Sequence, residues 1–346
     1  MRILAFQYYA AIFLSALVLI VSIAYRLPPI HYFNKTCKPR TIRLLSSFTQ
    51  TNIPVFVYPA NNEIVTAPKR ELSVITVFMG TKDEQLLPFF LKDVYRQKIF
   101  CSHTPCETEM LIGTTIDHLC TISYRTLRTL WDFVHDDSRN NTRLVIFWKD
   151  PGLYGMWNYL IKHHATGKYV LNANMDDGRR SDAWANKVEY LEKHEDVDVV
   201  SAPVYFSSNQ QHAKRWNDGE FRKTLQLYYA DMSGKINVSP LQFFRWHVVN
   251  GTRVVWPFNF PHNSPMWRRR THQRAGWFNQ TFSPFSDFEF WLRCQHLGIH
   301  FFVLNEALDL YYEDPTSFSR VGWAGASYER RVSAAAAYLF RMYIVK

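Results

Sequence analysis

Residues 152–177 read GLYGMWNYLIKHHATGKYVLNANMDD and join a helix signal, a strand signal and a pair of carboxylates. The first part predicts a helix closed by Gly167, and KYVLNANM (168–175) predicts a buried strand. Asp176 and Asp177 follow this strand directly. Ligands of parallel α/β sheets bind beyond the carboxyl ends of the strands, so the pair stands where a ligand is expected.

The elements around this stretch alternate between strand and helix. We expect strands at 72–80, 109–115, 143–148 and 196–206, and helices at 86–97, around 123–135 and at 181–194. Such alternation predicts an α/β fold with a mainly parallel sheet covered by helices on both faces.

Three blocks in this order resemble one known family. A first strand-loop-helix unit is followed by residues 152–177, and SDFEFWLRCQHLG (286–298) comes later. The arrangement resembles glycosyltransferase family 2, the inverting enzymes of the GT-A fold, over about residues 71–315. The resemblance implies a Rossmann-like domain at 71–346 that moves one sugar from a nucleotide-sugar to a glycan, protein or lipid. It also implies Mn²⁺ or Mg²⁺ as cofactor.

The resemblance assigns the carboxylate stretch to the donor and its metal. Asp176 takes the position of the metal ligand, and Asn174 and Asp177 take donor-binding positions, with Asn174 replacing an aspartate of the family pattern. Hard oxygen ligands suit Mg²⁺ and Mn²⁺. The alternative is a plain surface turn, because Asp-Asp-Gly is also a common turn sequence.

Other donor-side positions lie earlier in the chain. The segment after the first predicted strand supplies Gly80, Thr81 and Asp83, and Asn158 takes the position of an asparagine near the diphosphate. The family's aspartate after its second strand is missing, and Thr114 or Thr115 stands in its place.

An inverting transfer needs a base that accepts the proton of the acceptor hydroxyl. The resemblance assigns this role to Asp287, with Glu289 as a second catalytic or acceptor-binding candidate. The alternative is a helix N-terminus, where acidic residues are favoured by the helix dipole.

Three weaker candidates come from the segment that precedes Asp287. Arg268 can meet phosphate or lie on a solvated face, and Trp267 can stack on a sugar or fill the core. His262 can approach the metal or diphosphate, although a lone histidine is more often structural.

The N-terminus predicts a membrane anchor. Residues 3–25 carry no charge, and at about 1.5 Å per residue such a helix crosses a hydrocarbon core of roughly 30 Å. We therefore expect a signal-anchor helix at 1–25 and a stem at 26–70, with a cleaved signal peptide as the alternative.

Sequons and cysteines favour the lumen of the secretory pathway, and the Golgi membrane in particular. The N-x-S/T sequons begin at Asn34, Asn140, Asn237, Asn250 and Asn279. The chain has 5 cysteines, which an oxidising lumen allows to form two disulfides with one thiol over. Cys101 and Cys106 can instead form half of a zinc site, but no second Cys/His pair completes it.

Composition and charge bound the remaining possibilities. A chain of 346 residues with 47% hydrophobic residues can bury a large core. The net charge of +10 comes from scattered basic residues, which favours anionic substrates or a membrane surface over nucleic acid. The second function that we consider is a catalytically inactive relative that binds glycans or scaffolds other proteins.

Overall fold

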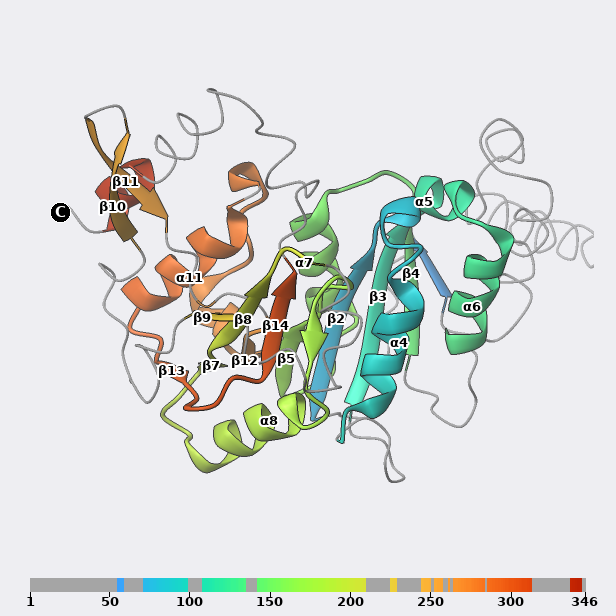
Figure 1. Ribbon diagram of the computed structural model, residues 1–346, viewed down its shortest axis with the longest axis horizontal. Helices are drawn as coiled ribbons and strands as arrows, with labels where there is room; N and C mark the ends of the chain where they lie inside the picture. The colour runs from blue at the N-terminus through green and yellow to red at the C-terminus, as the bar shows by residue number, and fades with distance from the viewer. Residues whose placement is uncertain are drawn as a thin grey trace, which may run out of the picture.

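The computed structural model describes residues 55–58, 71–98, 108–134, 142–209, 225–228, 244–249, 252–257, 261, 264–283, 285–312 and 337–343. Its centre is an eight-stranded sheet with helices on both faces (Figure 1). In spatial order the strands are β1 (Val55–Tyr58), β4 (Thr142–Phe147), β3 (Thr108–Thr115), β2 (Leu72–Phe78), β5 (Tyr169–Asn172), β12 (Met266–Arg268), β7 (Val199–Ser201) and β13 (Phe301–Val303).

The sheet is mainly parallel. β1, β4, β3, β2 and β5 run in one direction, and β7 and β13 run parallel to each other. β12 is the exception, because it pairs antiparallel with β5 on one side and β7 on the other. The predicted α/β class is therefore confirmed as a mixed α/β fold with a mainly parallel sheet.

The helices occupy the stretches that the periodic patterns indicate. Their bounds are α4 (Leu87–Arg96), α5 (Ile116–Thr121), α6 (Tyr124–Val134), α7 (Leu153–His163), α8 (Ala183–Lys193), α10 (Thr271–Ala275) and α11 (Ser286–His296), with 3₁₀ turns η1 (Gly80–Lys82) and η6 (Gln280–Phe282) and a further helix at 337–343. α7 ends before Gly167, so this glycine does not close the helix as expected. A Cβ at Gly167 would lie 2.5 Å from the backbone nitrogen of Ser73, which explains the glycine by close packing instead.

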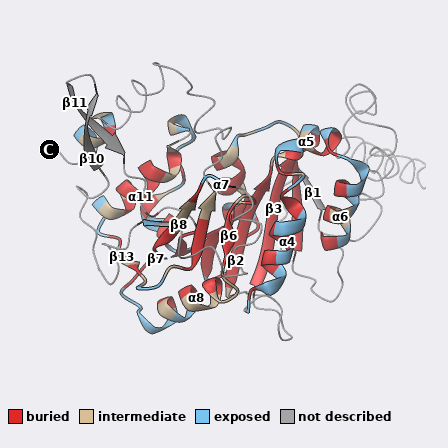
Figure 2. Cartoon of the chain, in the orientation of Figure 1, coloured by how far each residue is buried: buried red, intermediate tan, exposed pale blue. Residues whose placement is uncertain are grey.

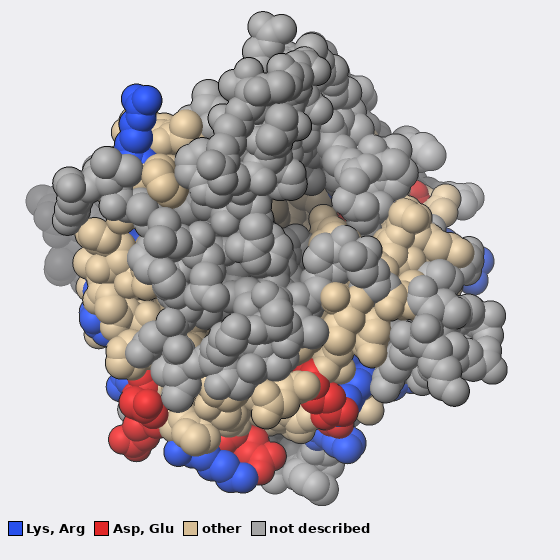
Figure 3. All heavy atoms as spheres, turned by 60° about the vertical axis from the view of Figure 1, so that its left-hand side comes forward, with Lys and Arg blue, Asp and Glu red and all other residues tan. Residues whose placement is uncertain are grey.

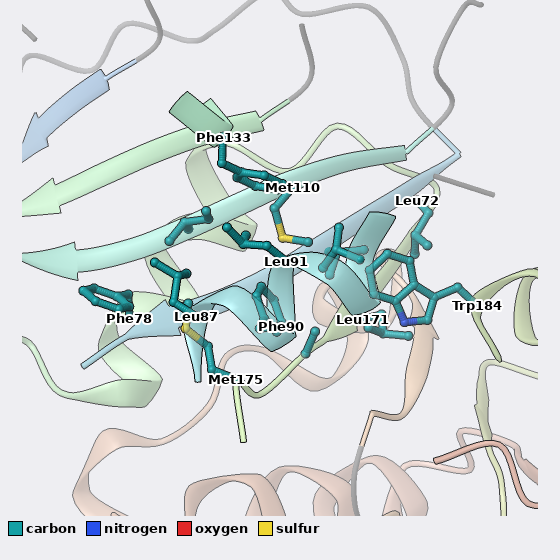
Figure 4. Packing of buried hydrophobic residues seen from close by; sticks show 14 of the residues in the cluster. Leu72, Phe78, Leu87, Phe90, Leu91, Met110, Phe133, Leu171, Met175 and Trp184 are labelled. Carbon is teal, nitrogen blue, oxygen red and sulfur yellow. The ribbon is translucent and has the colours of Figure 1, made fainter. Parts of the chain in front are cut away.

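Alternate residues of the strands feed two hydrophobic clusters, one on each face of the sheet. In β2, Val74 belongs to the cluster beneath α4, α6 and α8, while Ile75 belongs to the cluster beneath α7 and α11. Figure 4 shows the first cluster, with Phe90 and Leu91 of α4 among strand residues such as Met110 and with Trp184 of α8. The strands are buried along their length, as expected for a sheet that is covered twice (Figure 2).

A smaller sheet and a hairpin complete the described part of the chain. The sheet has the order β6 (Gly178–Arg179), β14 (Asp309–Tyr312), β8 (Val204–Ser207) and β9 (Gln226–Tyr228), and the hairpin joins β10 (Phe244–Val249) and β11 (Thr252–Pro257). The stretch 196–206, predicted as one strand, therefore forms β7 in the central sheet and β8 in the smaller one. Pro203 lies between them and has no N–H group to continue a ladder.

The structure describes one segment, β1, within the predicted N-terminal anchor and stem. β1 lies within the stretch 26–70 that we expected to be a stem, and it pairs with β4, so the sheet begins earlier in the chain than residue 71. Within the described ranges, no helix has the length and apolarity needed to cross a membrane. The predicted anchor at 1–25 lies outside these ranges.

The surface in Figure 3 shows how the charges are distributed on one face. Among the residues drawn in colour, basic and acidic side chains lie next to one another along the lower rim. Such mixing is unlike the continuous basic surface that binds a nucleic-acid backbone. This face therefore agrees with the expectation that the net positive charge is dispersed.

Candidate active site

The loop between β5 and β6 holds the carboxylate pair at the carboxyl end of β5. Asp177 is buried, whereas Asp176 and Asn174 are partly exposed. The backbone N–H of Tyr312, at the end of β14, donates to Asp177 Oδ1 at 3.2 Å, and Asn174 Nδ2 donates to Asp177 Oδ2 at 3.0 Å. Asp177 therefore orders the loop, and Asp176 is the more exposed carboxylate of the two.

The electrostatic environment of Asp177 favours the uncharged state. Burial raises its pKa well above the ordinary value, the neighbouring Asp176 raises it further, and Arg179 opposes both effects. Two carboxylates this close repel each other unless a positive charge joins them. A cation bound beside the pair would relieve this repulsion.

Arg179 braces the loop from beneath. It is fully buried, and its guanidinium donates to the carbonyl oxygens of Asp177 at 3.2 Å and Asn174 at 2.5 Å. Its backbone N–H donates to Asp93 Oδ2 at 2.9 Å, which ties the loop to α4. Arg179 is not among the site residues expected from the sequence, because an arginine in a charged turn usually points to solvent.

The strand that contacts Asp177 is anchored by a second buried cation. Lys187 Nζ of α8 lies 2.6 Å from Asp309 Oδ2 of β14 and 2.8 Å from the Ser264 carbonyl oxygen. Both side chains of this ion pair are buried. Removal of one partner of such a pair leaves an uncompensated charge, so the pair fixes β14 beside the carboxylate loop.

The loop residues fit a divalent metal that is only partly held by protein. Asp176 offers a carboxylate, and Asn174, whose Nδ2 bonds to Asp177, can offer its Oδ1. Over the part of the chain that the structure describes, no group of three or more His, Cys, Asp or Glu side chains could hold a metal alone. Mg²⁺ is commonly bound by one or two carboxylates together with substrate phosphates, and this donor set matches that pattern.

Gly80, Thr81 and Asp83 lie at the carboxyl end of β2, next to β5 in the sheet. Gly80 has a φ of 69°, and Asp83 Oδ2 accepts a hydrogen bond from the backbone N–H of Met79 at 2.6 Å. Asp83 is thereby buried within the turn, and Thr81 is exposed. The geometry leaves Thr81 as the member of this group that a ligand can reach.

Thr114 and Thr115 serve the fold at the end of β3. Thr114 Oγ1 donates to the Phe78 carbonyl oxygen at 2.9 Å, and Thr115 Oγ1 accepts from the His118 N–H at 3.1 Å as the N-cap of α5. Neither hydroxyl takes the place of a carboxylate directed at a ligand.

Asp287 lies in the first turn of α11 and is partly exposed. Its Oδ1 accepts hydrogen bonds from the Tyr154 hydroxyl at 2.8 Å and from the Phe288 N–H at 2.9 Å. The helix N-terminus that we considered as an alternative is therefore present, and the same geometry holds the carboxylate in one orientation. A fixed carboxylate at a helix N-terminus can serve both structure and chemistry.

Glu289 occupies a different environment from Asp287. It is buried, and its two oxygens accept from the Arg293 guanidinium at 2.8 and 2.9 Å. The Tyr343 hydroxyl adds a third hydrogen bond at 2.9 Å, and burial with the Glu289 charge raises the pKa of Tyr343 to about 12. These contacts join α11 to the helix at 337–343, and the catalytic or acceptor-binding role of Glu289 stays a prediction.

Trp267 and Arg268 of β12 are also structural. Trp267 is fully buried and donates through Nε1 to His272 Nε2 at 3.0 Å. Arg268 pairs in register with Tyr169, at the amino end of β5, and donates to the carbonyl oxygens of Val197, Leu191 and His194. It therefore lies at the amino ends of the strands, opposite the carboxylates, and its contact with phosphate stays a prediction. His262 lies outside the described residues.

Asn158 is committed to the protein backbone. Its Nδ2 donates to the Phe278 carbonyl oxygen at 2.8 Å, and its Oδ1 accepts from the Phe278 N–H at 3.0 Å. Both ends of the amide are therefore engaged with the chain that leads to α11, which is a different use from the expected contact with the diphosphate.

The two carboxylate groups lie on the same side of the fold. The Tyr154 hydroxyl, on α7, bonds to Asp287 and is close enough to Tyr311 of β14 to interact with it electrostatically, and the backbone N–H of the next residue, Tyr312, donates to Asp177. Asp177 and Asp287 are 110 positions apart in the sequence (287 minus 177). Tyr154 stood inside the quoted stretch, but only the structure brings its hydroxyl to Asp287.

Comparisons with known proteins agree with this architecture. No protein-family model matches the chain, and no curated protein matches it. The structure of Staphylococcus aureus TarS 1–349 in complex with UDP has a TM-score of 0.50 at 14% identity, covering 80% of this chain and 67% of that one. Mannosyltransferase PcManGT from Pyrobaculum calidifontis, in complex with GDP-Man and Mn²⁺, has a TM-score of 0.49 at 15% identity, covering 95% and 80%.

Of these two structures, one was solved with UDP, and the other is named a mannosyltransferase and was solved with GDP-Man and Mn²⁺. At 14% identity the TarS match establishes a shared mixed α/β architecture with a mainly parallel central sheet. The match shows the fold alone, and proposals on the activity, the donor and the metal rest on the residues of this chain.

Proposed function

We propose that this protein is an inverting, metal-dependent glycosyltransferase that moves one sugar from a nucleotide-sugar to a glycan, glycoprotein or glycolipid acceptor. One observation carries the proposal: a partly exposed Asp176 beside buried Asp177 follows β5, and Asp287, partly exposed and oriented by Tyr154, lies on the same side of the sheet. The fold shared with TarS, whose structure holds UDP, supports a nucleotide donor.

Each carboxylate has a separate task in the proposed reaction. Asp176, with Asn174, holds the divalent ion, while Asp177 and Arg179 keep the loop in shape. When bound, the metal neutralises charge that develops on the departing diphosphate. Asp287 accepts the proton of the acceptor hydroxyl while that oxygen attacks the anomeric carbon from the face opposite the diphosphate.

A second function is favoured by one specific observation. Asn174 places a neutral amide where the family pattern has an aspartate, and it directs its Nδ2 toward Asp177. A weaker metal site would suit an inactive relative that binds glycans or scaffolds other proteins. Asp176 and Asp287 would then have no need of their present environments, which is why we place this function second.

We further propose that residues 1–25 anchor the protein in a membrane of the secretory pathway, namely that of the Golgi, and that the domain works in the lumen. The sequons support this location, and Asn279 is exposed on the surface. Cys120 is disulfide-bonded, whereas Cys294 is a buried free thiol, which fits an oxidising compartment with one thiol over.

The test uses the full-length protein in detergent and a panel of nucleotide-sugars with Mn²⁺ or Mg²⁺. Donor binding is measured calorimetrically, and transfer to water or to added acceptors is measured by nucleotide release. We expect one donor to bind only with metal and Asp176→Ala to abolish that binding. Asp196→Ala, which changes an exposed aspartate at the opposite edge of the sheet, serves as the matched control.

The outcomes separate the two functions. Binding that survives Asp176→Ala would remove the metal assignment. A folded protein that ignores every nucleotide, with or without metal, but binds glycans would establish the second function instead.

A further inference from the structure

Tyr154 lies on α7 and is buried against α11, where its hydroxyl bonds to Asp287. The hydroxyl donates to Asp287 Oδ1 at 2.8 Å, and the Phe288 N–H donates to the same oxygen at 2.9 Å. Two donors that converge on one carboxylate oxygen define the rotation of the carboxylate plane. The orientation of Asp287 is therefore determined jointly by its own helix and by a residue from 133 positions earlier in the chain.

The phenol ring of Tyr154 is itself fixed. Only 6% of the residue is exposed, and the ring packs edge-on against Trp157, with ring centroids 5.3 Å apart, and in a tilted arrangement against Phe278 at 5.9 Å. Burial raises the pKa of Tyr154 well above its ordinary value, and the Asp287 charge raises it further. Tyr154 consequently keeps its proton at neutral pH and acts as a hydrogen-bond donor.

A second attachment lies one helical turn further along α7. Asn158 stands on the same face as Tyr154 and exchanges two hydrogen bonds, of 2.8 and 3.0 Å, with the backbone of Phe278. Between them, a Cβ at Gly155 would lie 3.1 Å from Gln280 Oε1, so the glycine lets the helix approach η6 closely. α7 is thus joined by hydrogen bonds at two points, to α11 through Tyr154 and to Phe278 through Asn158, and it lies close to η6 at Gly155.

We propose that Tyr154 is a positioning residue for Asp287 and that Asn158 holds the segment that carries Asp287 in place. This inference rests on the proposed function. During transfer the acceptor oxygen forms its bond to the anomeric carbon, and the bond to the diphosphate breaks with its electron pair on the diphosphate. The acceptor proton goes to the Asp287 carboxylate, and Tyr154 retains its own.

The test compares Tyr154→Phe, Asp287→Asn and the double variant in the full-length protein. Loss of a hydrogen bond to a charged group predicts that Tyr154→Phe lowers kcat by about 10- to 100-fold. KM for the donor is expected to stay within about threefold, because Tyr154 acts on the acceptor side. In the double variant, Tyr154→Phe should add little to the loss from Asp287→Asn, since both changes remove the same function.

Tyr159→Phe is the matched control, because Tyr159 lies on α7 but packs against Phe147 and His163. Its kcat is expected to equal that of the wild type. If wild type is active, Asp287→Asn is inactive and Tyr154→Phe matches wild type, the positioning role is refuted while the proposed function stands. If Asp287→Asn is fully active, the assignment of Asp287 as the base fails, and the positioning role fails with it. If the wild type transfers no sugar, the proposed function itself fails, and the positioning role again fails with it.

A variant that keeps the hydroxyl covers the case in which Tyr154→Phe does not fold. With 3-fluorotyrosine at position 154, the ¹⁹F resonance should shift when Asp287→Asn is introduced. A resonance that ignores that change would overturn the proposed contact.

Discussion

Buried carboxylates lie at both ends of the strands of the central sheet, Glu109 at the amino ends (the amino edge) and Asp177 at the carboxyl ends (the carboxyl edge). The charges around these two carboxylates differ. At the amino edge, Glu109 Oε1 accepts from Ser73 Oγ at 2.5 Å and from the N–H and hydroxyl of Thr166 at 2.6 and 2.9 Å. Its Oε2 lies 3.2 Å from Arg143. At the carboxyl edge, Asp177 has two donors and a second carboxylate, Asp176, beside it.

The difference shows how one residue type serves two purposes. Glu109 has a cation of its own, so its charge is balanced within the fold and ties three strands and the end of α7 together. The Asp176–Asp177 pair instead places two carboxylates close together near Arg179, and burial together with the Asp176 charge raises the pKa of Asp177. Carboxylates with a perturbed pKa at the carboxyl ends of parallel strands are candidates for a ligand site.

The largest expected effect is at the carboxyl edge. Asp287→Asn keeps the shape of the side chain but cannot accept the proton, so sugar transfer should fall by about 100- to 10,000-fold. The thermal midpoint should change little, because the amide can still accept from Tyr154. Initial-rate assays with differential scanning fluorimetry on the same samples check both statements. Unchanged transfer would mean that another group is the base.

The complementary change is at the amino edge. Glu109→Ala leaves Arg143 buried without its partner and should lower the free energy of unfolding by about 3–5 kcal/mol. The activity of the molecules that remain folded should be unchanged. Urea unfolding measures the loss, with Glu189→Ala as control, since the Lys193–Glu189 pair is exposed and its removal should leave the stability nearly unchanged. Equal losses for the two variants would contradict the assigned role of Glu109.

Two buried histidines predict a loss of stability in acid. Burial lowers the pKa of His164 to about 4, with Arg143 adding to the effect, and burial likewise lowers the pKa of His272 to about 4. The unfolded chain then binds protons that the folded protein excludes, so stability falls as pH drops from about 6.5 to about 4. Each histidine should contribute about 3 kcal/mol to this fall.

His272→Gln is expected to flatten this slope while retaining a donor and an acceptor for Gly276 and Trp267. Unfolding midpoints between pH 4 and 7 provide the comparison. A slope identical to that of wild type would show that His272 titrates normally.

The smallest effects come from the two glycines that flank α7. A Cβ at Gly167 would meet backbone atoms of Ser73 at 2.5 Å, so Gly167→Ala forces the strand to shift and should cost about 1–3 kcal/mol. Gly152, at the carboxyl ends of the strands, has a φ of 74° and a ψ of 165°, a region essentially restricted to glycine, and nothing within 4 Å, so Gly152→Ala should cost about 1–3 kcal/mol through backbone strain alone. Chemical denaturation of both variants measures the two costs. A variant as stable as wild type would contradict the reason given for its glycine.

Local patterns predicted most of the central elements because those patterns are set by burial. The runs at 72–80, 109–115 and 143–148 are apolar since both faces of the sheet are covered, and they became β2, β3 and β4. β1 was missed because its four residues lie in a stretch rich in proline and asparagine. Local periodicity has no means of showing that such a short segment finds a partner in β4, far along the chain.

The candidate site was less predictable than the fold. The position of Asp176 and Asp177 followed from the strand that precedes them, and this strand is present as β5. The roles of Arg268, Glu289 and Asn158 depend instead on which distant backbone groups they meet. An arginine beside two others looks solvent-exposed in sequence, yet Arg268 is buried against carbonyl oxygens of two other elements.

The position of β12 has a consequence for folding while the chain is being synthesised on the ribosome. β5 and β7 are separated in the sheet by β12, whose three residues are made some 65 positions after β7 ends, a delay of several seconds at about 5–20 residues per second. Until Met266 emerges, the two halves of the sheet have no strand between them, and each presents an unpaired edge. Unpaired edges invite intermolecular strand pairing, so nascent chains that stall before this point are expected to need chaperone protection.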